Sequence, residues 1–161
     1  MIDKQKLVEQ IIQQLSDYAA NLSKAAQTAH KDATGEESKA ENKYDTRGLE
    51  ASYLAESQAN MAAEAIQNVS SYKTIELKEF PSDSKIELTA LIELEAEDGA
   101  KSFYFLGPNS GGTEIECENK KILLITPSSP IGMKLLRREK GDIITTKING
   151  NKKEYEIINI W

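Results

Sequence analysis

The chain has 161 residues, of which 39% are hydrophobic and 6% aromatic, and its 26 acidic residues outnumber its 20 lysines and arginines. This length allows one domain of ordinary size or two small ones. The net charge of −6 disfavours a primary role in wrapping DNA or RNA, because such proteins are expected to be basic. No apolar run is long enough to cross a membrane, so we expect a cytoplasmic protein without membrane contact. The single cysteine, Cys117, excludes an internal disulfide and a zinc site built from cysteines.

The composition of the chain changes near residue 70. Residues 1–70 contain no proline and are rich in Ala, Gln, Glu and Lys, which favour helices. Residues 71–161 hold all four prolines and most of the Ile, Thr and Phe, which favour strands and turns. We therefore predict an α+β protein with a helical domain at 1–70 and a sheet domain at 71–161.

Apolar residues of the first domain recur in alternating steps of three and four, the spacing of helices that pack along each other. One series is Val8, Ile11, Leu15, Tyr18, Leu22, Ala25 and Ala29, and the other is Ala51, Leu54, Gln58, Met61 and Ala65, with Val69 one step out of phase. Ser/Thr-x-x-Glu patterns at 34–37 and 38–41 are typical of a helix start. The spacing predicts an antiparallel helical hairpin (a coiled coil) whose first helix ends near Asp32 and whose second begins between Thr34 and Ser38.

Acidic residues gather around the predicted turn of the hairpin. They are Asp32, Glu36, Glu37, Glu41 and Asp45. Exposed carboxylates can bind a hard cation such as Mg²⁺, which keeps several waters and needs further ligands. The hairpin tip would then supply half of a metal site that a partner completes. The alternative is a solvated turn whose acids stabilise the N-terminus of a helix.

The second domain reads as a series of short strands with one short helix. The predicted strands are 72–80, 86–96, 101–105, 121–125, 142–148 and 154–160. Alternation along 86–96 favours an antiparallel strand with one solvated face. Ser129 and Pro130 are typical of the cap and first position of a helix. Asn149-Gly150 predicts a tight hairpin between the last two strands.

Charge is unevenly distributed along the second domain. Residues 134–153 carry seven basic residues against two acids, whereas residues 76–98 carry eight acids against two lysines. Such a dipolar surface can orient a charged partner during encounter. The alternative is interspersed surface charge that serves solubility.

Several short motifs follow one another in the second domain. They are Phe105-Leu106-Gly107-Pro108, Thr126-Pro127-Ser128-Ser129-Pro130-Ile131-Gly132-Met133-Lys134-Leu135-Leu136, Lys140-Gly141-Asp142 and Tyr155-Glu156-Ile157. This series resembles the C-terminal signature of the bacterial Gre transcript-cleavage factors. The predicted hairpin is similar in placement and length to theirs, so the resemblance covers nearly the whole chain.

The resemblance implies a fold, a partner and a function. The second domain would be FKBP-like, a curved antiparallel sheet with a short helix. It would dock on RNA polymerase through residues Ser129, Pro130, Gly132, Lys134, Arg137 and Arg138. The hairpin would enter the secondary channel, where Glu36, Glu37, Glu41 and Asp45 act in trans on backtracked RNA, with Glu41 and Asp45 sharing Mg²⁺ with the polymerase. The protein would be an accessory factor rather than an enzyme, without a cofactor of its own and with only indirect contact to nascent RNA and DNA.

The sequence departs from the family pattern at the tip. Aligning Glu41-Asn42 with the Glu-Asn of that pattern places Ser38 where an Asp is usual. This departure keeps open a regulator that occupies the channel without cleavage, similar to the regulators of nucleoside diphosphate kinase. A prolyl isomerase is disfavoured, because three Phe and one Trp offer few walls for an apolar pocket. We expect a monomer, although a heptad pattern can also pair helices of two molecules.

Overall fold

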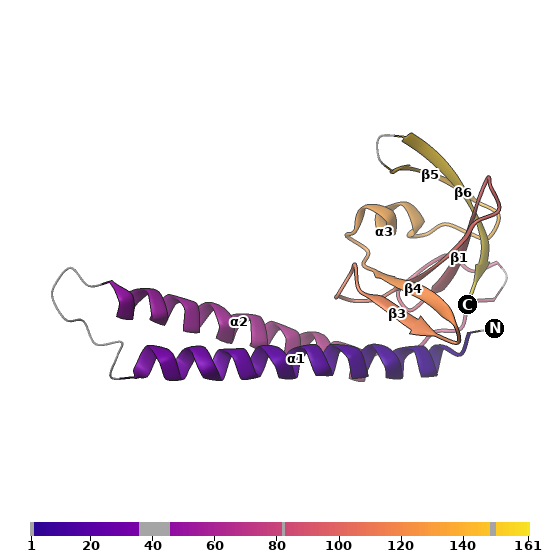
Figure 1. Ribbon diagram of the computed structural model, residues 1–161. Helices are drawn as coiled ribbons and strands as arrows, with labels where there is room; N and C mark the ends of the chain where they lie inside the picture. Colours follow the sequence, from indigo (N-terminus) through magenta and orange to yellow (C-terminus); the bar gives the residue numbers. More distant parts are fainter. Residues whose placement is uncertain (1, 36–45, 82, 149–150) are drawn as a thin grey trace. The chain divides into compact units, whose positions relative to one another are not determined.

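The computed structural model describes residues 2–35, 46–81, 83–148 and 151–161 (Figure 1). The elements are α1 (Lys4–Thr34), α2 (Arg47–Lys73), β1 (Leu91–Ala96), β2 (Lys101–Leu106), β3 (Glu114–Cys117), β4 (Lys120–Ile125), α3 (Pro130–Leu135), β5 (Ile143–Ile148) and β6 (Asn151–Ile160). They form two compact units. We call Met1–Gln10 with Thr74–Trp161 the sheet unit, and Ile11–Lys73 the hairpin unit. Whereas the predicted division follows residue 70, α2 continues to Lys73, and the first ten residues group with the sheet.

A capping residue sets the start of α1, and a side-chain hydrogen bond marks its last turn. At the start of α1, a carboxylate oxygen of Asp3 accepts from the backbone N–H of Gln5 at 2.9 Å. At its end, the Thr34 hydroxyl donates to the His30 carbonyl at 2.9 Å, which places Thr34 in the last turn of α1. The prediction that the second helix begins between Thr34 and Ser38 is wrong, because α2 begins at Arg47. The second predicted cap pattern, 38–41, lies outside the described residues.

The two helices of the hairpin unit bury small side chains together with a few larger ones. Leu15 and Ala19 of α1 are buried, as are Ala62 and Ala65 of α2. Ser16, Ala19, Ala20 and Ser23 of α1 line a shallow groove together with Ile66, Val69, Ser70 and Lys73 of α2. The predicted hairpin is therefore confirmed, with helices of 31 and 27 residues.

The register of the predicted heptads differs by one residue at several positions. Tyr18 is 54% exposed, and Leu54 and Met61 are exposed as well, so the prediction that they face the partner helix is wrong. Ala19 and Ala62 take the inward positions instead, because a small side chain lets the two backbones approach. In this register Val69 is in phase with Ala62 and Ala65.

The sheet unit contains a six-stranded sheet in the order β3-β4-β2-β1-β6-β5. The neighbours pair antiparallel, except that β2 and β4 run parallel from Phe103↔Ile122 to Leu106↔Ile125. The predicted α+β class is confirmed, but the predicted antiparallel sheet is mixed at this pair. The parallel pairing arises because the chain passes from β2 to β3 at the outer edge before it returns as β4 between them.

Apolar side chains are buried on both faces of the sheet. One face carries Ile92, Leu94, Leu106, Ile125 and Ile157, and Leu135 of α3 packs against it. The alternate residues Leu91, Phe105, Ile122, Leu124 and Ile115 are also buried, and they face the other side. Ile2 and Leu7, which belong to the same unit, are buried too. The prediction that 86–96 keeps one solvated face is therefore wrong, and even Glu93 is only 6% exposed.

Lys4 attaches the start of the chain to the segment that precedes β1. Its ammonium group donates to the backbone carbonyl of Lys78 and to that of Thr89, the latter at 3.4 Å. The same nitrogen lies 4.8 Å from the centroid of the Phe80 ring. Partial burial lowers the pKa of Lys4, with Glu79 opposing this effect. The first turn of α1 is thus held to the sheet unit by polar as well as apolar contacts.

The predicted strands at 101–105, 121–125, 142–148 and 154–160 correspond to β2, β4, β5 and β6. The strand predicted at 72–80 is wrong, since α2 runs to Lys73 and no strand follows before residue 81. The strand predicted at 86–96 begins only at Leu91, because Thr89 has a φ of 74° that interrupts an extended chain. The turn predicted at Asn149-Gly150 lies outside the described residues. Within the described part, neither long helix is apolar enough to cross a lipid bilayer.

Candidate functional site

The residues predicted to carry function fall into two sets. Glu36, Glu37, Glu41 and Asp45, which include the two predicted Mg²⁺ ligands, all lie outside the described residues. The six predicted polymerase-binding residues lie on α3 and beside it. Among the residues that the structure describes, no group of three or more His, Cys, Asp or Glu side chains could hold a metal ion.

Two of the six predicted residues, Ser129 and Gly132, build the turn into α3. The Ser129 hydroxyl accepts from the Gly132 N–H at 3.1 Å and donates to the Thr126 carbonyl at 2.8 Å. A Cβ atom on Gly132 would lie 1.9 Å from the Thr126 carbonyl oxygen, so only glycine fits there. These contacts account for Ser129 and Gly132 as residues that shape the turn. Pro130, at the first position of the helix, is exposed.

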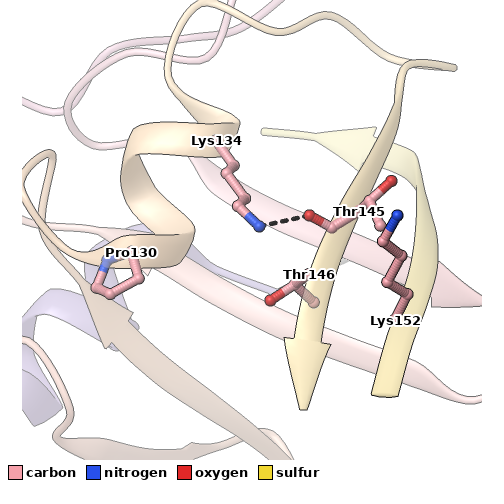
Figure 2. A pocket seen from close by; sticks show the side chains of 5 residues that line it. All are labelled: Pro130, Lys134, Thr145, Thr146 and Lys152. Carbon is pink, nitrogen blue, oxygen red and sulfur yellow. Dashed lines mark hydrogen bonds between the residues drawn. The ribbon is translucent and has the colours of Figure 1, made fainter. Parts of the chain in front are cut away.

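Lys134 reaches from α3 to the free edge of the sheet. Its ammonium donates to the backbone carbonyl of Thr145 on β5, the terminal strand (Figure 2). Pro130, Lys134, Thr145, Thr146 and Lys152 line an open groove of about 460 Å³ at this edge (Figure 2). A lysine that covers a strand edge discourages pairing with a further strand. The groove therefore presents positive charge rather than open backbone.

A second groove, also of about 460 Å³, lies next to the first between α3 and β5. Three of its lining side chains are apolar and exposed, with Met133 at 62% and Ile143 at 60%, joined by Leu136. Lys134 and Arg138 line the same groove. We call Met133, Lys134, Leu136, Arg138 and Ile143 the α3–β5 patch. An apolar surface bordered by cations is suited to docking an acidic partner surface.

The two arginines after α3 are held by their backbone. The N–H of Arg137 donates to the Ile86 carbonyl, and the N–H of Ile86 donates to the Arg138 carbonyl, both at 2.8 Å. Arg137 has a φ of 66°, the left-handed region, so these two bonds fix an unfavourable conformation. The side chains of both arginines are exposed, and Arg138 lies 3.8 Å from the Asp142 carboxylate. Of the two arginines, only Arg138 lines the second groove.

The apolar half of the α3–β5 patch is not among the residues predicted from the sequence. Met133 and Leu136 occupy the outer side of the short helix whose inner side carries Leu135, so helical spacing alone could have indicated them. Ile143 had no such signal, because its approach to α3 depends on how β5 joins the sheet. The patch therefore forms only where α3 and β5 come together in the folded sheet unit.

Two buried reactive groups have structural explanations. Glu93 accepts from Lys101 Nζ at 2.9 Å and from Asn159 Nδ2 at 2.7 Å. Burial raises the pKa of Glu93, but these two hydrogen bonds, together with the charges of Lys101 and Lys120, outweigh it and leave that pKa below its ordinary value. Burial, followed by the charge of Glu118, raises the pKa of the Cys117 thiol. A buried thiol of this kind is a poor nucleophile.

Comparison with known proteins connects these features to a family. The family model of the C-terminal part of the transcription elongation factors GreA/GreB matches residues 65–161. GreA factor homolog 1 (Gfh1) of Thermus thermophilus is 21% identical over 93% of this chain and 94% of its own, with a TM-score of 0.40. Gfh1 of Thermus aquaticus is also 21% identical over 92% of each chain, with a TM-score of 0.42.

A GreA/GreB elongation factor from Nitrosomonas europaea is 16% identical over 70% of this chain and 91% of its own, with a TM-score of 0.40. No curated protein matches the chain. The family match extends over more than half of the chain and includes α3, the grooves beside it and the whole sheet. The chain therefore belongs to the GreA/GreB family of transcription elongation factors.

Proposed function

We propose that this protein binds RNA polymerase through the α3–β5 patch and places its helical hairpin in the secondary channel, where it promotes cleavage of backtracked RNA. Gre-family factors are accessory proteins that bind RNA polymerase. The observation that carries the proposal is the family match over the sheet unit, combined with a hairpin of two long helices. Contact with nascent RNA and DNA would be indirect, within the elongation complex.

The charge of the α3–β5 patch supports its role in docking. Lys134 and Arg138 border three exposed apolar side chains, and no acid lines that groove among the residues described there. Apolar contact would supply affinity, and the two cations would favour an acidic surface on the polymerase. Ser129 and Gly132 contribute indirectly, because they fix the turn that carries Lys134.

The segment that joins α1 to α2 carries the acids of the proposed chemistry. Glu36, Glu37, Glu41 and Asp45 stand between the end of α1 and the start of α2 in the sequence. Carboxylate oxygens are preferred ligands of Mg²⁺, and hydrolysis of a phosphodiester commonly uses two such ions. Glu41 and Asp45 would supply oxygens to an ion that the polymerase also holds, and the other acids would orient the attacking water.

Cleavage of RNA in a stalled complex tests the proposal. Glu41→Ala, and the double change Glu36→Ala/Glu37→Ala, should each lower the rate of transcript shortening by purified polymerase at least about tenfold. The first removes a proposed Mg²⁺ ligand, and the second removes acids that would orient the attacking water. Binding to the polymerase, measured by co-sedimentation, should persist. Glu9→Ala removes an acid from the opposite end of α1 and serves as the matched control. Full stimulation by the tip variants would contradict the role given to these acids.

A second candidate function is occupation of the channel without cleavage, as in the regulators of nucleoside diphosphate kinase. Ser38 favours it, because the family pattern has an Asp at the position that Ser38 takes. Under this alternative, the protein would compete with a cleavage-competent Gre factor for the polymerase and cause no shortening of its own. The same cleavage assay, run with and without that competitor, separates the two functions.

A further inference from the structure

We draw no further inference here: the strongest candidate, the exposed apolar surface patch that Tyr53, Leu54 and Met61 form on one face of α2, carries none because nothing in the structure shows what covers it.

Discussion

The hairpin unit and the sheet unit differ in how many large apolar side chains they bury. The sheet unit buries large residues such as Phe105, Leu106 and Ile122 on the two faces of its strands. The hairpin unit buries Ala19, Ala62 and Ala65 along with a few larger side chains, such as Leu15 and Tyr72, and leaves Tyr53 and Leu54 exposed. Full burial of a large apolar side chain contributes about 1.5–3 kcal/mol, and an alanine methyl contributes much less. The large apolar residues that the hairpin unit leaves exposed therefore contribute little to its own stability.

Gly132→Ala is the substitution that we expect to destabilise the sheet unit most. The added methyl carbon would lie 1.9 Å from the Thr126 carbonyl oxygen, so the backbone must move and α3 must shift from the sheet. We expect a loss of about 3 kcal/mol in the free energy of unfolding, measured by urea titration. Met133→Ala, at the exposed neighbouring residue, should change little. A Gly132→Ala protein as stable as the parent would contradict the close packing of α3.

A matched pair of variants on α2 tests the packing of the hairpin unit. Ala65→Leu adds volume where the two helices meet and should cost about 1–3 kcal/mol by forcing them apart. Leu54→Ala removes an exposed side chain and should change stability by no more than about 0.5 kcal/mol. Amide hydrogen exchange in α2 measures both. The opposite ranking would mean that the seam runs through Leu54, as the sequence pattern first indicated.

Acid should weaken the sheet unit through Glu93. Its pKa is lower in the folded chain than in the unfolded chain, so the unfolded chain takes up a proton first as the pH falls. The stability that Glu93 contributes is complete above its unfolded pKa and is lost as the pH falls through its lower folded pKa. We expect Glu93→Gln to cost about 1–2 kcal/mol at pH 7 and less at low pH, where the parent loses the same contribution.

Urea titrations at several pH values measure this effect, and Glu114→Gln is the control. Glu114 forms an exposed pair with Lys121 at 2.9 Å, and such pairs contribute little to stability. If the stability of the parent and of Glu93→Gln depended equally on pH, Glu93 would not be the source of the loss in acid.

The features that the sequence predicted correctly have local causes. The cap at Ser129 and the proline at 130 specify the start of α3, and the apolar runs of β2 and β4 specify strands. The heptad register was less certain, because Tyr18 and Ala19 are adjacent and both apolar. β3 was not predicted, because it has only four residues. Its turn into β4 also lacks an Asn-Gly pair and uses Glu118 and Asn119, with φ of 50° and 60°.

The candidate site was predictable only in part for the same reason. The motif around α3 indicated the region in which the α3–β5 patch lies, but two of its residues, Ser129 and Gly132, shape the turn and do not line the groove. Ile143 joins Met133 through the pairing of β5 with β6, which local sequence does not encode. A motif thus indicates where a surface lies better than it indicates which side chains compose it.

The hydrogen bonds of Lys4 to the carbonyls of Lys78 and Thr89 constrain the order in which the protein folds during synthesis. Residues 2–10 leave the ribosome before any strand exists, yet they belong to the unit that the last strands complete. The hairpin unit can form while synthesis continues, because its two helices are local in sequence. The sheet unit must wait for β6, which pairs with both β1 and β5, so the base of α1 finds its finished binding surface only late in synthesis.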